Sequence, residues 1–153
     1  SDPFNPFYHE LLGEIYFATG EFKLAIIEQE KAINLFASEN DLYLMMLGSY
    51  LLAEPTNSNI LKSIAVLNKS LFLNKYNSYA WYLLAKAYAS NNNLSLAQYA
   101  SAERYYLWGE RSLALDFARK AIKNIDKDSV EWYRANDLIE LILGIDAKDN
   151  KDR

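Results

Sequence analysis

The sequence predicts an all-α protein, built as an array of about eight helices arranged in helical hairpins. About half of the 153 residues are apolar, while three prolines and five glycines are spread through the chain. This composition favours helices over long loops. Apolar residues recur at steps of three and four, as on one side of a helix. The small residues Gly13, Gly48 and Ala85, each preceded by Leu, follow at intervals of 35 and 37 residues, which indicates a repeat.

The clearest hairpin is predicted at residues 76–109. Its first helix places Trp81, Leu84 and Tyr88 on one stripe beside the small Ala85, and Asn91-Asn92-Asn93 ends it. The packed side of the second helix is expected to carry Leu94, Ala97, Ser101 and Tyr105. The spacing Trp-x2-Leu-Ala-x2-Tyr is typical of tetratricopeptide repeats. We therefore expect a right-handed superhelical array of such repeats.

The other repeats follow from the same pattern and define a single domain over residues 5–143. Repeats are predicted at 6–39 and 40–75, each opened by an asparagine cap at Asn5 or Asn40. An irregular final unit is expected at 110–143, because Ala114 follows Ala97 by only half a repeat. Whether the helix at 93–108 closes repeat three or opens the next unit stays open.

The last helix is expected to begin at Asp128-Ser129, where Glu131 completes a capping-box arrangement. Its packed side carries Trp132, Ala135 and neighbouring aliphatic residues, and Gly144 is expected to end it. Residues 144–153 alternate in charge and are predicted to form a frayed tail.

Composition excludes several classes of function. The net charge of −4 argues against nucleic acid as a partner, since a duplex binder needs a basic surface. The absence of cysteine excludes disulfides and thiolate metal sites. No apolar run approaches the roughly twenty residues of a membrane span. The chain starts at Ser1 without an initiator Met, which predicts a segment of a longer protein.

No constellation of catalytic residues is recognisable, so we expect a chain without an active site, metal or cofactor. His9-Glu10 begins like the zinc-peptidase motif His-Glu-x-x-His, but the fifth position is Gly13 and the chain has no other histidine. One imidazole does not make a catalytic zinc site, so His9 is expected to pack or to face solvent. Carboxylates such as Glu28 and Glu30 are expected on solvated helix faces.

Protein or peptide binding is the function that the aromatic surplus favours. In repeat arrays of this type the first helix of each hairpin lines the concave wall, where exposed aromatic residues and Met can contact a partner. The alternative, that these residues pack between hairpins, stays open. The helix at 93–108 ends in three aromatic residues, Tyr105, Tyr106 and Trp108. They mark either a second binding surface or the seam of the half-repeat. The candidate partner-binding residues are Phe7, Glu10, Glu14, Phe17, Met45, Ser49, Tyr79, Tyr82 and Lys86.

A carboxylate clamp is not expected, because Lys86 is the one cation on this predicted wall. The wall as a whole carries mixed charges, with Glu10 and Glu14 opposite in sign to Lys86.

Four stretches together resemble one family. They are the residues 5–13 (Asn-Pro-Phe-Tyr-His-Glu-Leu-Leu-Gly), 80–88, 102–110 and the ending 129–137 (Ser-Val-Glu-Trp-Tyr-Arg-Ala-Asn-Asp). The chain resembles, over about residues 5–143, the C-terminal tetratricopeptide domain of bacterial periplasmic zinc metallopeptidases of the β-barrel assembly-enhancing type. None of that family's zinc ligands matches a position here.

The resemblance implies an exported, periplasmic protein whose zinc site lies upstream of Ser1. It also implies that this domain holds outer-membrane proteins or their assembly machinery near the protease. Two alternatives stay open. The chain could be a freestanding scaffold or oligomerisation domain, or it could pack against its own peptidase domain and gate it.

Overall fold

The computed structural model describes residues 4–149, and within that range helices joined by turns and short loops are the only regular secondary structure, with no strand. This confirms the predicted all-α class and the number of helices. The helices are α1 (Pro6–Ala18), α2 (Phe22–Leu35), α3 (Asp41–Ala53), α4 (Asn57–Leu73), α5 (Ser78–Ser90), α6 (Leu94–Leu107), α7 (Arg111–Ala121) and α8 (Val130–Asp149).

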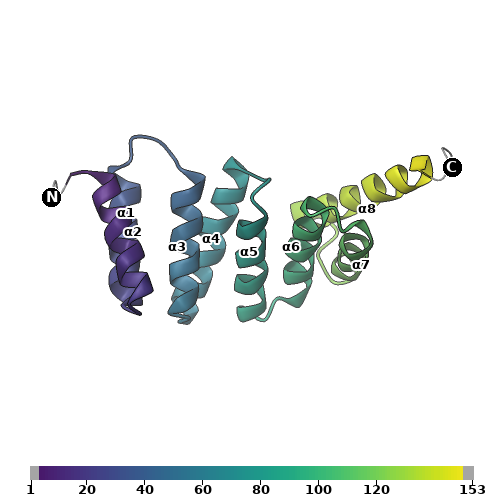
Figure 1. Ribbon diagram of the computed structural model, residues 1–153. Helices are drawn as coiled ribbons and strands as arrows, with labels where there is room; N and C mark the ends of the chain where they lie inside the picture. Colours follow the sequence, from purple (N-terminus) through teal and green to yellow (C-terminus); the bar gives the residue numbers. More distant parts are fainter. Residues whose placement is uncertain (1–3, 150–153) are drawn as a thin grey trace.

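The helices stand side by side as a row of hairpins (Figure 1). The most extensive contacts join α1 to α2, α3 to α4, α5 to α6 and α6 to α7, and smaller ones join α2 to α3 and α4 to α5. In Figure 1, α1 and α3 lie in front of α2 and α4. We call the surface formed by α1, α3 and α5 the first-helix face.

Asparagine residues start four of the helices. The side chains of Asn5, Asn40, Asn77 and Asn93 each accept hydrogen bonds from backbone N–H groups in the first turn of α1, α3, α5 and α6. Such caps satisfy donors that have no partner within the helix. Asn92 has a φ of 57°, a left-handed conformation that asparagine tolerates, and it turns the chain from α5 into α6. The asparagines that the sequence marks as helix boundaries therefore act as caps and turns.

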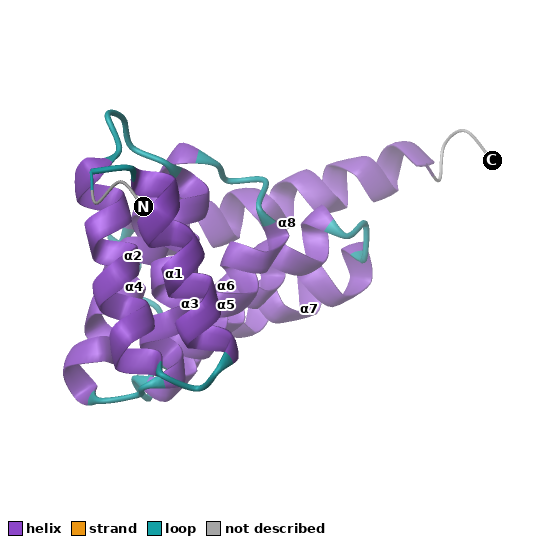
Figure 2. Cartoon of the chain, turned by 60° about the vertical axis from the view of Figure 1, so that its left-hand side comes forward, coloured by secondary structure: helices purple, strands orange, loops and turns teal. Residues whose placement is uncertain are grey.

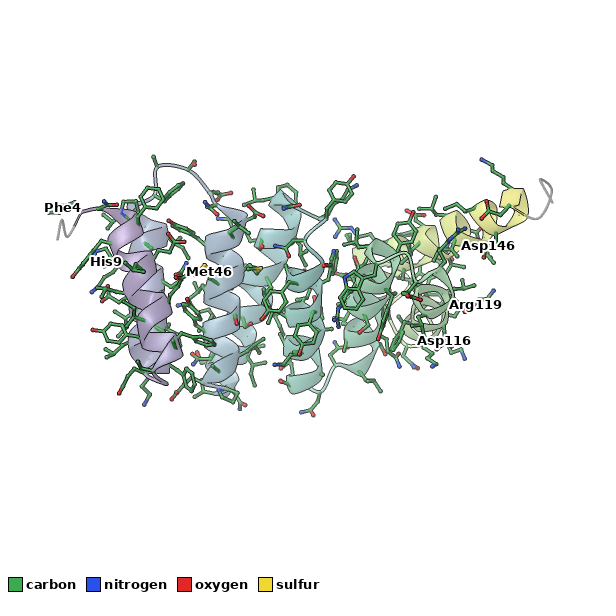
Figure 3. The ribbon with its side chains drawn as sticks, in the orientation of Figure 1. Phe4, His9, Met46, Asp116, Arg119 and Asp146 are labelled. Carbon is green, nitrogen blue, oxygen red and sulfur yellow. The ribbon has the colours of Figure 1, made fainter. Side chains whose placement is uncertain are left out.

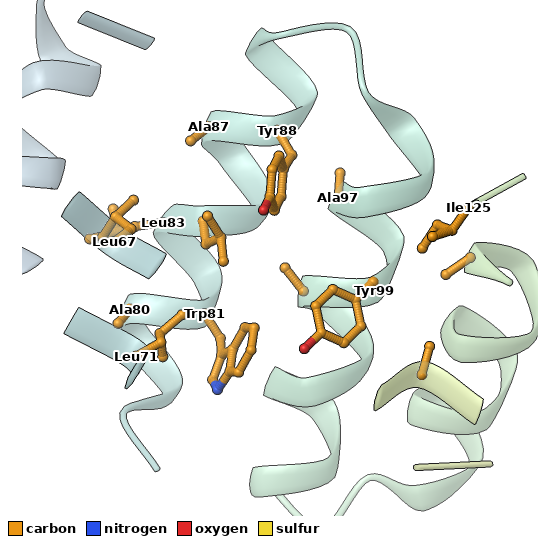
Figure 4. Close-up of a cluster of buried hydrophobic side chains, with 14 residues drawn as sticks. Leu67, Leu71, Ala80, Trp81, Leu83, Ala87, Tyr88, Ala97, Tyr99 and Ile125 are labelled. Carbon is orange, nitrogen blue, oxygen red and sulfur yellow. The ribbon is translucent and has the colours of Figure 1, made fainter. Parts of the chain in front are cut away.

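The main core lies around Trp81, between α4, α5 and α6 (Figure 4). The Trp81 ring meets Tyr99 edge to face, with ring centroids 5.6 Å apart. Its indole Nε1 donates to the carbonyl of Lys75 at 2.8 Å, so the buried polar atom is satisfied. Leu67 and Leu84 are fully buried beside it. The stripe predicted from Trp81, Leu84 and Tyr88 is thus the centre of the core.

Helix α6 belongs to two hairpins, which resolves the alternative that the sequence left open. It packs against α5 and against α7 to a similar extent. Ala97 and Ala100 lie in the core that α6 shares with α5, while Ala102 lies in a second core with Ala114 of α7 and Ile142 of α8. Alanines on both sides let two helices approach α6 closely. The half-repeat spacing of Ala97 and Ala114 is the sequence signature of this double use.

Helix α8 differs from its prediction at both ends. Ser129, rather than Asp128, is the cap, because its Oγ accepts from the backbone N–H of Trp132 at 3.2 Å. Gly144 does not end the helix, which runs on to Asp149. Arg111 at the start of α7 donates to Asp146 at 3.2 Å and to Asp149 at 2.8 Å. The predicted frayed tail is therefore wrong for 144–149, and 150–153 lie outside the described residues.

Replacing Arg111 by alanine is expected to loosen the last turns of α8 while leaving global stability essentially unchanged, because exposed ion pairs contribute little. Amide hydrogen exchange at residues 145–149 should speed up while exchange in α5 stays the same. Lys120→Ala, which removes an ion pair within α7 to Asp116, is the control. Unchanged exchange in 145–149 would show that Arg111 does not hold this segment.

As it leaves the array, α8 diverges from the other helices and ends well away from them (Figure 2). Its contacts are with α7 and, to a lesser extent, with α6. Among the helices of residues 4–149, none combines the length and the apolar character that crossing a membrane requires. The direction of α8 leaves a groove beside α6.

Candidate docking surfaces

Much of the first-helix face near α1 is used for contacts within the chain. Phe7 meets Phe36 edge to face at 5.9 Å, and Phe36 in turn meets Tyr43 at 5.1 Å. Glu10 Oε2 accepts a hydrogen bond from the Tyr43 hydroxyl at 2.8 Å. Burial and this carboxylate raise the pKa of Tyr43 to about 12. Phe7 and Glu10 therefore join α1 to the second hairpin, although the Phe7 ring stays 60% exposed.

The middle of the face shows the same pattern. Phe17 stacks on Tyr50 with ring centroids 4.6 Å apart. Burial, with the nearby charges of Glu14 and Glu10, raises the pKa of the Tyr50 hydroxyl to about 12. Met45 accepts a hydrogen bond from Asn77 Nδ2 at its sulfur, 3.3 Å away, and packs against the main core.

Glu14 is exposed on α1 and Ser49 is half-buried on α3. The contacts of Phe17 with Tyr50 and of Met45 with Asn77 place these two residues between neighbouring hairpins, as the packing alternative expected.

The α5 end of the face remains open. Tyr79 is 51% exposed and stacks on Tyr82 with centroids 5.8 Å apart. Lys86, an exposed residue one turn further on, has its Nζ 5.6 Å from the Tyr82 ring centroid. These three predicted residues are brought together by the helical steps of three and four. They form a small aromatic and cationic surface on α5.

His9 belongs to a buried ion-pair cluster on α1 and α2. Its Nδ1 lies 2.5 Å from Glu28 Oε2, and Lys31 donates to Glu28 Oε1 at 2.7 Å. Figure 3 labels His9 on α1. Glu28 was expected on a solvated face, and this is wrong: the residue is buried, because Lys31 and His9 compensate its charge. Within the described residues, no group of three or more His, Cys, Asp or Glu could hold a metal ion.

Glu28→Gln is expected to destabilise the chain by about 2 kcal/mol at neutral pH, since it removes charge-assisted hydrogen bonds to His9 and Lys31. Burial alone raises the pKa of Glu28, but the bonds and charges of Lys31 and His9 outweigh it, so the net pKa is lowered. A lowered folded-state pKa stabilises the fold above the unfolded pKa, and this contribution is lost as pH falls through the folded value. The difference in unfolding free energy should therefore shrink below about pH 4.3.

Urea denaturation of both proteins across this pH range tests the expectation. Glu30→Gln is the control, because Glu30 pairs with Lys62 on a more exposed part of α2. A difference between Glu28→Gln and the parent chain that stays constant down to pH 3 would contradict the assignment.

A large hollow lies elsewhere, between α4, α5, α6 and α8. We call it the α6–α8 groove. It has a volume of about 810 Å³. Phe72 and Tyr76 at its rim are 83% and 72% exposed. The lining residues are Asn68, Leu71, Phe72, Lys75, Tyr76, Trp81, Tyr99, Glu103, Tyr106, Leu107, Arg134, Asp137, Leu138 and Leu141.

The floor of the groove combines a buried tyrosine with charged groups. Burial raises the pKa of the Tyr99 hydroxyl well above its ordinary value, with the Glu103 charge adding to the effect. Burial also raises the pKa of Glu103, and the Arg134 charge partly offsets this. Tyr99, Glu103 and Arg134 thus interact with one another at the floor. The groove combines apolar walls with both signs of charge.

Helix α6 separates the groove from the first-helix face. At 100° per residue, Tyr99, Glu103 and Tyr106 lie on one side of α6, and Arg104, Tyr105 and Trp108 lie on the other. The first set lines the groove. In the second set, Tyr105 stacks on Phe117 at 5.3 Å and Trp108 contacts Arg104. The three residues therefore do not share one role. Tyr106 lines the groove, as the alternative of a second binding surface expected, and Tyr105 packs on α7, as the alternative of a seam expected.

Two groove residues, Phe72 and Tyr76, were not among the predicted site residues. The sequence does contain one indication of this site: Phe72 is a large aromatic residue that does not share the packed side of α4, which carries Ser63, Leu67 and Ser70. An aromatic residue off the packed side of a repeat helix has no place in the array's own core. The groove, however, depends on the direction of α8, which no repeat pattern specifies.

No protein-family model matches this chain, and no curated protein matches it.

Proposed function

We propose that this chain is a non-catalytic docking module of the tetratricopeptide type, which binds a segment of another protein in the α6–α8 groove. The observation that carries the proposal is the groove itself, a hollow of about 810 Å³ with two largely exposed aromatic side chains at its rim. Exposed aromatic residues that surround a hollow are typical of interaction sites.

The dimensions and chemistry of the groove favour a peptide or helix over a small metabolite. Leu138 and Leu141 of α8, together with Leu71 and Phe72 of α4, line the hollow and supply apolar contact. Lys75, Asp137, Glu103 and Arg134 supply two charges of each sign at the same site. An amphipathic segment that inserts apolar side chains and pairs its own charges with these residues would use every part of the lining.

The wider setting follows from the resemblance of the sequence. We propose that the chain is the C-terminal docking domain of an exported, periplasmic zinc metallopeptidase, with zinc held upstream of Ser1. It would bring outer-membrane proteins or their assembly machinery to the protease. The support is the 35- and 37-residue spacing of Gly13, Gly48 and Ala85, together with the Ser129 to Asp137 ending. Sequencing upstream of Ser1 tests this, since a complete His-Glu-x-x-His and an export signal are expected.

Photo-cross-linking tests the docking function. A benzoylphenylalanine in place of Phe72 is expected to give one discrete adduct with another protein in cells that express the full-length parent. The same group in place of Leu61, a 58% exposed residue of α4 outside the groove, should not. Tyr76→Ala should lower the yield from position 72. Equal adducts from both positions, or none from Phe72, would contradict the proposal.

Self-association through the groove is the competing explanation, since the same aromatic residues could join two copies. Light scattering of the purified chain distinguishes the two functions. The docking proposal expects a monomer, and the adduct at position 72 should then contain a different protein. A stable dimer that Phe72→Ser dissociates would favour an oligomerisation domain.

A further inference from the structure

Arg104 of α6 lies between two aromatic rings on the side of α6 opposite the groove. Its guanidinium carbon is 4.6 Å from the Tyr82 centroid and 4.0 Å from the Trp108 centroid. Rings that cover the faces of a guanidinium fix its position while its N–H donors, which lie in its plane, remain available. Arg104 is therefore held in place by stacking. Arg104 was not among the predicted site residues, because its contact with Tyr82 depends on how α6 packs against α5.

A second cation approaches the same tyrosine. Lys86 Nζ lies 5.6 Å from the Tyr82 centroid, so Tyr82 carries one cation from α5 and another from α6. Across residues 4–149, neither cation is within 4 Å of a carboxylate. The Nε of Arg104 is buried without a hydrogen bond inside the described chain. Because this atom is buried, a carboxylate of a partner would be bound through the terminal N–H groups of the guanidinium.

The surroundings supply apolar contact on both sides. Tyr79 is 51% exposed beside Tyr82, and Trp108 is 54% exposed beside Arg104. We call Tyr79, Tyr82, Lys86, Arg104 and Trp108 the cation–aromatic cluster. In a chain with a net charge of −4, it is a local positive site framed by aromatic rings.

We propose that the cation–aromatic cluster binds an acidic segment of a partner protein, with two side-chain carboxylates placed on Lys86 and Arg104 and apolar neighbours on Tyr79 and Trp108. Two cations on separate helices match a pair of acidic side chains better than a single terminal carboxylate. The planar guanidinium can bind one carboxylate through two parallel hydrogen bonds, while the ammonium acts as a point charge. This surface adds to the proposed docking function and lies on a different face from the groove.

Lys120 provides a matched control. Its Nζ is also 5.6 Å from an aromatic centroid, that of Phe117, but it already pairs with Asp116 at 2.6 Å. Lys86 and Lys120 thus share a contact with a ring and differ in whether a carboxylate of the chain is bound. Lys86 is therefore expected to bind the ligand, and Lys120 is not.

Selection of short random peptides displayed on phage tests the proposal, because such peptides have no free C-terminus. Peptides bound by the chain are expected to be enriched in pairs of Asp or Glu near aromatic or aliphatic residues. Measured by fluorescence anisotropy, their affinity should fall about fivefold with Lys86→Gln and at least as much with Arg104→Gln. Lys120→Gln should leave it unchanged, and added salt should weaken binding.

Several results would overturn the proposal: no enrichment of acidic residues, equal binding to the Lys86→Gln chain, or binding that follows a free terminal carboxylate in synthetic peptides. Lys86 is exposed, so Lys86→Gln keeps the test decisive even if Arg104→Gln disturbs packing. Phe72→Ser, which alters only the groove, separates the two surfaces. Acidic peptides that lose affinity with Phe72→Ser and not with Lys86→Gln belong to the groove and refute the cluster.

Discussion

Replacing Trp81 by alanine is expected to lower the free energy of unfolding by about 3–5 kcal/mol, the usual cost of removing a large buried aromatic side chain. The ring is only 5% exposed and lies at the centre of the main core. The change removes the edge-to-face contact with Tyr99 and leaves the Lys75 carbonyl without its indole donor. Helices α4 and α6 also pack on α3 and α7, which limits how far they can move into the resulting cavity.

Trp108→Ala is the matched control for this experiment. Trp108 lies on α6's other side and is 54% exposed, so its loss should cost less than about 1 kcal/mol. Chemical denaturation of the three proteins, with equal slopes in denaturant, gives the comparison. A cost below about 1 kcal/mol for Trp81→Ala would mean that the core is not organised around this residue.

The substitution Gly48→Ala is expected to destabilise the chain, although alanine is the better helix former by about 1 kcal/mol. A Cβ at Gly48 would lie 2.6 Å from Cγ of Leu67, which is fully buried. The branch point of a buried leucine has no free space to move into, so α3 and α4 must separate. Overpacking of this kind costs about 1–3 kcal/mol. The clash outweighs the gain in helix propensity.

Gly13→Ala is expected to have the opposite sign. A Cβ there would meet its nearest neighbours at 3.4 to 3.5 Å, which is ordinary contact, so the gain in helix propensity should remain. Thermal and urea unfolding of both variants would show one less stable and one more stable than the parent chain. The double variant Gly48→Ala with Leu67→Ala should be less destabilised than the two single effects added together. Additive effects, or a stabilised Gly48→Ala, would contradict the packing of α3 on α4.

Much of the fold could be predicted because its causes are local or periodic. Asn5, Asn40 and Asn93 mark helix starts through bonds to residues two or three positions away. Apolar residues at helical spacing, such as Trp81 and Leu84, identify buried stripes without knowledge of the partner helix. The hairpins of α1 to α6 follow from these signals and from the repeat length.

Other features depend on residues far apart in the chain and could not be predicted in this way. Glu28 is buried only because His9, 19 positions away, and Lys31 both contact it. Gly144 is a common helix end, but in α8 the ion pairs of Arg111 with Asp146 and Asp149 tie the following turns to α7. Helix α8 therefore continues past Gly144 because contacts with α7 stabilise its last turns.

The candidate surfaces show the same division. Tyr79, Tyr82 and Lys86 share one side of α5 by spacing alone, so they could be predicted. Arg104 joins them only because α6 packs beside α5, and this brings a second cation to the surface where one was expected. The groove requires the direction of α8 relative to α4, for which the repeat pattern gives no rule.

We propose that this chain docks other proteins on two surfaces beside α6. The most direct test is an NMR titration of the isotope-labelled chain with the peptides selected from the random library. We expect saturable shifts confined to two sets of residues, those that line the α6–α8 groove and those of the cation–aromatic cluster. Peptides that cause no shifts in either set, or that shift only α1 and α2, would contradict the claim.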